Sequence, residues 1–139
     1  MKIMLEVSTG DFLDRVSILE IKEERFTDGA RRANVEAHLA ALAAMHRAAL
    51  GSSPDLPGAY DDLKAVNETL WDIENQIRAC EAAGDFGPTF VELARSVYIS
   101  NDRRAAIKRS IDDIVGSAFT EEKEYHGDRE HDAEPRAEA

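Results

Sequence analysis

Apolar residues recur at steps of three and four along four stretches of the chain, which is the spacing of a helix face. The third stretch has the most regular pattern, with apolar positions at Ala59, Leu63, Val66, Leu70, Ile73, Ile77 and Cys80. Such a seam is typical of helices that pack lengthwise in bundles and coiled coils. The four patterns predict helices over residues 9–26, 30–50, 59–83 and 89–115.

Capping residues mark the ends of these predicted helices. Ser8, followed three residues later by Asp11, is typical of a helix start, and Asp28 is suited to cap the second helix. Gly84 and Gly116 follow the last periodic residues of the third and fourth helices, where glycine commonly ends a helix. The segment GSSPDLPG, residues 51–58, is predicted to be the loop between the second and third helices.

The four amphipathic patterns predict an all-α fold in a single domain of residues 1–120. We expect two helical hairpins that form an elongated antiparallel four-helix bundle. The first helix is apolar on more than one side, which favours a central position. Residues 2–7 are rich in Ile, Leu, Met and Val, and they allow a short two-stranded β ribbon with the segment from Ala118 to Tyr125.

Composition indicates an acidic, helix-rich chain. Of its 139 residues, 43% are hydrophobic and 32% are charged, with a formal net charge of -11. An acidic surface repels nucleic acid and anionic lipid, so we expect neither as a partner, and any anion site has to be local. Residues 121–139 hold eight acidic and three basic residues and almost nothing to bury, which predicts a disordered acidic tail.

The cysteine content and the first residues of the chain indicate in which cellular compartment the protein is expected. Cys80 is the single cysteine, so an intramolecular disulfide and a cysteine-based zinc site are excluded, as is usual in a reducing environment. The opening MKIMLEVSTGD has a short apolar run broken by Glu6, unlike a signal peptide, and no stretch reaches the roughly 20 apolar residues that span a bilayer. We therefore expect a cytoplasmic protein without a membrane segment.

The fourth predicted helix has polar residues where its apolar stripe should be most buried. Asn101, Arg104 and Lys108 interrupt the stripe between Val97 and Ile111. Burial of an unpaired charge costs several kcal/mol, so these groups have to be paired, exposed or available to a ligand.

Polar residues also interrupt the apolar faces of the first and third helices. Together they define a candidate ligand-binding site, here called the polar cluster: Lys22, Asn67, Trp71, Glu74, Asn101, Arg104 and Lys108. Two interpretations stay open, an interhelical network that fixes packing and a cationic pocket whose guanidinium fork binds a carboxylate or phosphate. The network is the commoner arrangement, because long charged side chains usually pair or extend into solvent.

A local basic cluster stands out on the fourth helix of this acidic chain. It consists of Arg103, Arg104, Lys108 and Arg109. An anion or the acidic tail would find complementary charge there. The ordinary alternative is pairing with Asp102, Asp112 and Asp113 at helical spacing.

Motifs for catalysis or for a cofactor are absent from the sequence. No glycine-rich phosphate loop follows a strand, and no nucleophile elbow occurs. No histidine follows a glutamate by three residues, as the metal sites of ferritin-like bundles require, so we expect no metal site. Cys80 lies on the packing seam without a histidine nearby in sequence to activate it. We therefore expect no cofactor and no catalytic residues, and the sequence leans away from an enzyme.

Three segments carry a family resemblance: VSTGDFLDRVSILEIKEERF (residues 7–26), NETLWDIENQIRACEAAGDFG (67–87) and ELARSVYISNDRRAAIKRSID (92–112). They resemble a family of small uncharacterised bacterial proteins, domain of unknown function 6165. The first segment is similar to the family pattern Gly-(Glu/Asp)-Leu-(Leu/Ile)-Asp-(Lys/Arg), followed by Ile-Leu-x-Ile-Lys, with Phe12 in place of the commoner Leu. The resemblance extends to about Tyr125. It implies a helical domain without an assigned activity and supplies no site residues.

Two functional hypotheses follow from the sequence. The first is a cytoplasmic binding or scaffolding module that acts through protein–protein contacts or self-association as a homodimer. The alternative is a small-molecule enzyme or sensor that binds an anionic ligand in a polar pocket of the bundle. Pairing of both Arg104 and Lys108 with acids would favour the first, and unused donors in a solvent-connected pocket would favour the second.

Overall fold

The computed structural model describes residues 1–116, which form four helices and the segments that connect them. These helices are α1 (Thr9–Arg25), α2 (Gly29–Gly51), α3 (Leu56–Ala83) and α4 (Pro88–Val115). The prediction of an all-α fold with four helices is confirmed, and their contacts fit a helix bundle. In this part of the chain, no helix has the length and apolar character needed to cross a membrane.

Local capping signals position the helix ends as the sequence predicts. The Ser8 hydroxyl oxygen accepts a hydrogen bond from the backbone N–H of Asp11 at 3.1 Å, and the side chain of Asp28 caps α2 in the same way. Gly84 and Gly116 both adopt a φ of 66°, in the left-handed region that favours glycine. They therefore end α3 and α4 without the strain that a side chain would add.

α3 begins at Leu56, three residues earlier than the apolar pattern predicts. The predicted loop over residues 51–58 is therefore too long. Pro57 lies in the first turn, where its missing N–H breaks no helical hydrogen bond and its fixed φ suits a helix. Leu56 is fully buried in the core, so tertiary packing favours a helix in a segment that glycine and proline mark locally as a loop.

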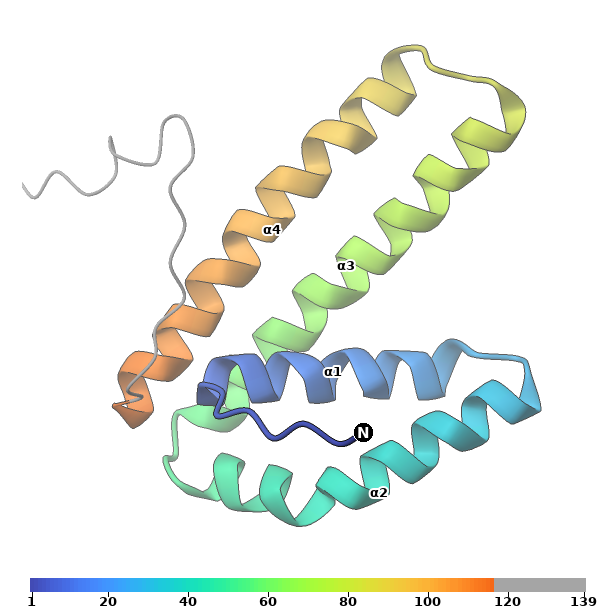
Figure 1. The fold of residues 1–139 in the computed structure, drawn as a ribbon. Coiled ribbons are helices and arrows are strands. Elements are labelled where there is room, and N and C mark those ends of the chain that lie inside the picture. Colours follow the sequence, from blue (N-terminus) through green and yellow to red (C-terminus); the bar gives the residue numbers. More distant parts are fainter. Residues whose placement is uncertain (117–139) are drawn as a thin grey trace, which may run out of the picture.

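The helices are arranged as two pairs that cross (Figure 1). α3 and α4 lie alongside each other and share the most extensive contact, while the α1–α2 pair lies across one end of them. α1 contacts all three other helices, in keeping with its broad apolar surface. The four helices do not share one long axis, in contrast to the elongated bundle expected from the sequence. With 17 residues, α1 is too short to cover the 28 residues of α3 or α4.

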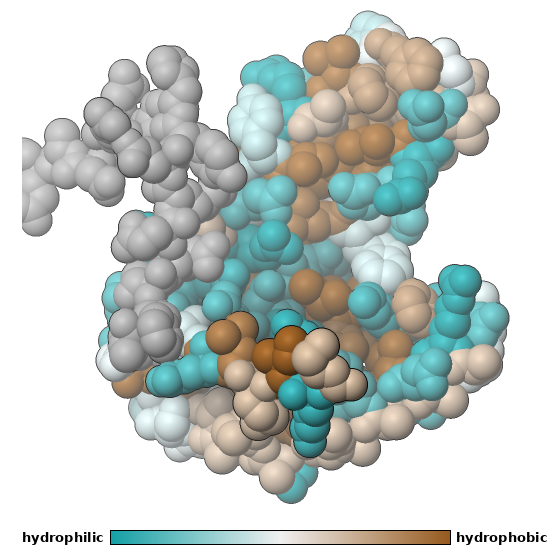
Figure 2. All heavy atoms as spheres, in the orientation of Figure 1, coloured by the Kyte–Doolittle hydropathy of each residue, from teal (hydrophilic) through white to brown (hydrophobic). Residues whose placement is uncertain are grey.

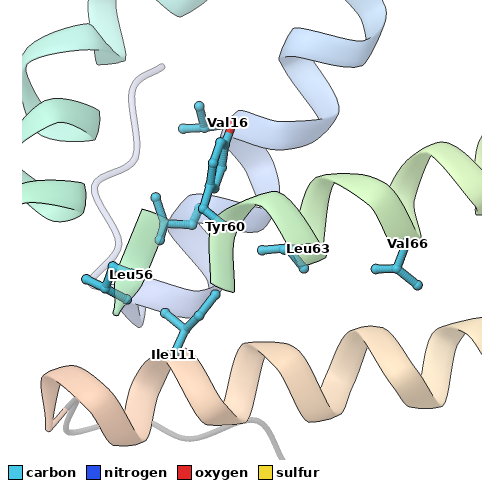
Figure 3. Packing of buried hydrophobic residues seen from close by; sticks show 7 residues of the cluster. Val16, Leu56, Tyr60, Leu63, Val66 and Ile111 are labelled. Atoms are coloured by element: carbon cyan, nitrogen blue, oxygen red, sulfur yellow. The ribbon is translucent and has the colours of Figure 1, made fainter. Parts of the chain in front are cut away.

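The hydrophobic core lies where α1 meets α3 and α4 (Figure 3). Its buried members are Leu13, Val16, Leu56, Tyr60, Leu63, Val66 and Ile111. The seam predicted along α3 has its buried members, Leu63, Val66 and Ile73, within the base. Its other members are half-buried: Ala59, Leu70, Ile77 and Cys80. We call α1, α2 and the core-forming parts of α3 and α4 the base.

Beyond the base, α3 and α4 continue as a two-helix extension, residues 74–100, which we call the projecting arm (Figure 1). No residue of the arm is buried in the described structure. The side chains of Phe86, Val91, Tyr98 and Ile99 are all more than half exposed. The arm therefore depends on contacts between its two helices alone.

Residues 1–7 contain no strand, so the structure does not support the predicted β ribbon. Ile3, Met4 and Leu5 are exposed by 78%, 84% and 81%. A single strand without a neighbour leaves its backbone hydrogen-bonding groups unpaired, which explains why this segment forms no regular element. The predicted partner segment, 118–125, and the acidic tail, 121–139, lie outside the described residues.

Candidate functional site

A cleft opens where the projecting arm leaves the base, and we call it the junction cleft. Its volume is about 570 Å³, a size common among small-molecule sites. It is lined by Ile18, Asn67, Leu70, Trp71, Glu74, Asn75, Arg78, Val97, Asn101 and Arg104. Figure 2 shows the surface hollowed between the α3–α4 extension and the α1–α2 pair.

The junction cleft brings together five of the seven residues of the polar cluster. They are Asn67, Trp71, Glu74, Asn101 and Arg104. The other two lie elsewhere. Lys22 lines a second cleft, which shares Ile18 with the junction cleft, and the ammonium of Lys108 lies 2.9 Å from the Asp11 carboxylate.

Arg104 has most of its hydrogen-bonding capacity available to the cleft. One of its terminal nitrogens donates a long hydrogen bond, 3.4 Å, to the side-chain oxygen of Asn67. Among residues 1–116, no carboxylate comes within ion-pairing distance of this half-buried guanidinium. A guanidinium carries five N–H donors, so several remain for a ligand. Lys108 is therefore paired with an acid, whereas Arg104 joins the interhelical contacts only through the amide of Asn67.

The Asn67 side chain is held in one orientation by α1. Its amide nitrogen donates to the carboxylate of Asp14 and to the hydroxyl of Ser17, both at 2.8 Å. Ser17 in turn donates to the backbone oxygen of Asp14, also at 2.8 Å. Because both amide hydrogens are used, the oxygen of Asn67 faces Arg104. Sequence reasoning did not include Ser17 or Asp14 in the cluster, although their spacing of three places them on one face of α1.

Apolar side chains form a separate part of the cleft wall. Ile18, Leu70 and Val97 contribute aliphatic surface, one from each lining helix. The ring of Trp71 lies 6.1 Å from that of Phe26 at an interplanar angle of 50°, which supports the indole from the α1–α2 connection. The cleft can thus contact a hydrocarbon or planar group beside its polar donors.

The remaining charges of the cleft largely compensate each other. Arg78 and Glu74 lie one helical turn apart, with 3.8 Å between the guanidinium and the carboxylate. Both side chains are more than half exposed, so the pair contributes little to stability. Arg104 is consequently the cleft cation with no acidic partner among the described residues.

A close contact joins α1 to α4 within the base. The backbone N–H of Gly10 donates to the buried carboxylate of Asp112 at 2.7 Å. A β-carbon on Gly10 would lie only 2.7 Å from the carbonyl oxygen of Lys108. Asp112 thus faces the N-terminus of α1, where free N–H groups and the helix dipole favour an anion. The expectation that Asp112 pairs with basic neighbours on its own helix is wrong, because α1 supplies a buried donor.

A second polar group joins α1 to α3 within the base. The ammonium of Lys64 donates to the Glu24 carboxylate at 2.5 Å and lies 3.4 Å from that of Glu20. Burial lowers the pKa of Lys64, but these carboxylates outweigh it and raise that pKa above its ordinary value. Burial, with the Glu20 charge beside it, also raises the pKa of the Tyr60 hydroxyl above its ordinary value.

The side chains that line the junction cleft are amides, charged groups and apolar groups. Of the ten described residues that line the junction cleft, none is a serine, threonine, cysteine, histidine or lysine. Within residues 1–116, no group of three histidine, cysteine, aspartate or glutamate side chains is placed to hold a metal ion. The cleft offers two guanidinium groups, three amides, a carboxylate and apolar surface.

Comparison with known proteins gives one match. Residues 1–133 match the family of unknown function designated DUF6165. Neither the curated proteins nor the solved structures contain a match to this chain.

Proposed function

Because the chain belongs to DUF6165, a family of unknown function, we infer its role from its own geometry. We propose that it binds a small carboxylate or phosphate in the junction cleft. The observation that carries this proposal is the half-buried Arg104, which faces the cleft without an acidic partner among the described residues. Partial burial strengthens the attraction between a guanidinium and an anion, because less water screens it. A local cation of this kind also gives an acidic chain a specific place for an anionic ligand.

The chemistry of the cleft limits the class of ligand. The planar guanidinium fork matches the two oxygens of a carboxylate or phosphate. Asn75 and Asn101 add amide donors and acceptors, while Leu70 and Trp71 offer surface to an apolar or planar group. We therefore expect a compact anion with a hydrocarbon or ring portion, and not a polyanion such as nucleic acid.

The support of Arg104 favours binding with little rearrangement. Asn67 is fixed by Asp14 and Ser17, and its oxygen accepts a hydrogen bond from Arg104. A side chain that is held before binding loses less conformational freedom when the ligand arrives. This arrangement suits a binding protein or sensor.

Thermal stability measurements test the proposal directly. Nucleotides, sugar phosphates and dicarboxylates would be screened against the wild type, Arg104→Ala and the control Arg103→Ala, whose side chain is exposed outside the cleft. A ligand at one hundred times its Kd stabilises the folded state by about 2.7 kcal/mol. We expect at least one anion to raise the melting temperature of the wild type and the control but not of Arg104→Ala. No stabilisation by any anion, or an equal shift in Arg104→Ala, would overturn the proposal.

A second candidate function is contact with a protein partner through the projecting arm. It is favoured by the exposure of Phe86, Val91, Tyr98 and Ile99, since two helices alone leave apolar faces uncovered. An amphipathic helix of a partner would cover such a face by the usual ridge-and-groove packing. Complexes isolated from the native source should be lost in Val91→Glu and retained in the arm control Glu92→Gln. A partner that binds Val91→Glu as well as the wild type would exclude the arm as its site.

A further inference from the structure

The exposed segment of residues 1–7 has a pattern of side chains that is complementary to itself. In an extended strand, successive side chains point to opposite faces. One face would carry only apolar residues, namely Met1, Ile3, Leu5 and Val7. The other would carry Lys2, Met4 and Glu6, a cation and an anion placed symmetrically about a methionine.

We propose that this segment pairs with the same segment of a second copy of the chain, as a two-stranded antiparallel ribbon centred on Met4. In this register Lys2 lies opposite Glu6 of the second copy, and the two-fold symmetry forms the same ion pair twice. Ile3 lies opposite Leu5 of the second copy on the apolar face. Registers centred on residue 3 or 5 keep the apolar residues together but separate Lys2 from Glu6. Charge complementarity therefore selects one register.

The base offers a surface against which such a ribbon can rest. Leu5 and Val7 line the second cleft, of about 530 Å³, together with Ile18, Lys22 and His38 from α1 and α2. Figure 1 shows the segment running beside the α1–α2 pair. Isolated two-stranded ribbons are marginally stable and need a packing surface, which this cleft supplies.

Pairing removes two unfavourable features of the single chain. Ile3, Met4 and Leu5 are each about four-fifths exposed, and their strand-forming composition makes an unpaired segment prone to uncontrolled association. A ribbon with a second copy satisfies alternate backbone groups and covers the apolar side chains in a closed dimer. The inference does not depend on the ligand proposed for the junction cleft.

Charge reversal provides a test that is insensitive to overall folding. The full chain with its native first residues would be prepared as wild type, K2E and E6K, and its mass in solution measured over a concentration series. We expect a wild-type dimer and monomeric single variants, because each variant places like charges opposite each other. An equimolar mixture of K2E and E6K should form a dimer that contains one chain of each. A monomeric wild type, a dimeric single variant or a mixture that stays monomeric would each overturn the proposal.

A crosslinking experiment tests the register itself. In a Cys80→Ser background, Met4→Cys places two thiols opposite each other at the two-fold axis, so oxidation should yield a covalent dimer. The matched control Lys2→Cys places its two thiols four residues apart along the ribbon, roughly 13 Å, which is too far for a disulfide. Equal crosslinking of the two variants, or none in Met4→Cys, would contradict the proposed register.

Discussion

The same two helices, α3 and α4, belong to the base at one end and to the projecting arm at the other. In the base, Leu63 and Ile111 are fully buried, whereas in the arm Phe86 and Ile99 are more than half exposed. Apolar residues recur at helical spacing in both regions. The difference arises because α1 lies across one end of α3 and α4, so it covers the base and leaves the arm without a third helix. An apolar pattern thus shows which face of a helix packs, but not how far along that face another helix covers it. The junction cleft lies where this cover ends.

The largest expected effect is a difference in stability loss between matched leucine substitutions in the base and in the projecting arm. Leu63→Ala removes a fully buried side chain from the base and should lower the free energy of unfolding by about 2–5 kcal/mol. Leu93→Ala removes the same atoms from the half-buried arm and should cost about 1 kcal/mol. Urea unfolding followed by circular dichroism measures both. Equal losses would mean that the arm is as well packed as the base, which would contradict the comparison.

The next effect concerns the contact between α1 and α4 that holds the base together. In Gly10→Ala the new β-carbon meets a backbone oxygen and the Asp112 carboxylate, so the helices have to move apart at a cost of about 1–3 kcal/mol. Gly58→Ala is the control, since nothing lies within 4 Å of its β-carbon position. It should leave the free energy of unfolding unchanged or slightly increased. A neutral Gly10→Ala would show that α1 does not approach α4 this closely.

Helix ends and local caps were predictable from the sequence because they depend on residues a few positions apart. Ser8, Asp28, Gly84 and Gly116 all act at the ends that their residue types indicate. The start of α3 was not predictable, since the burial of Leu56 by distant residues outweighs a local loop composition. The crossing of the helix pairs likewise depends on contacts such as that between Gly10 and Asp112, for which the sequence offers only a glycine near a helix start.

The candidate site shows the same division between local and distant information. Arg104 and Lys108 interrupt one stripe of α4 and were equivalent in the sequence. The structure separates them, because Asp11 of α1 reaches Lys108 while Asn67 presents only an amide oxygen to Arg104. Periodicity could therefore place both cations on an inward face, but only the tertiary arrangement distinguishes the paired one from the one that lines the cleft.

A smaller effect, confined to the base, should appear at alkaline pH. The raised pKa of Tyr60 means that the folded protein keeps a proton that the unfolded chain releases above the ordinary value of 10.0. Tyr60 therefore makes its full contribution to the free energy of unfolding below about pH 10. As the pH rises further, that contribution falls by at most about 1.4 kcal/mol per pH unit. The raised pKa of Lys64 acts in the same direction, since its ion pairs persist in the folded state above the ordinary 10.5.

Urea unfolding between pH 9 and pH 11 measures this dependence. The free energy of unfolding of Tyr60→Phe should decline less steeply over that range than that of the wild type. Tyr98→Phe is the matched variant in the arm, where the ring is exposed, and it should decline as the wild type does. An unchanged slope in Tyr60→Phe would show that this hydroxyl does not couple folding to pH.

Trp71 reports on the proposed binding of an anion through Arg104 in the junction cleft. It is the single tryptophan of the chain and lines the cleft, so its fluorescence reports on this location. Titration with the anion that gives the largest thermal shift should change the emission of the wild type along a saturable curve. The same titration should leave Arg104→Ala unchanged and Arg103→Ala as responsive as the wild type. A saturable change of equal affinity in Arg104→Ala, or no change in the wild type, would contradict the claim.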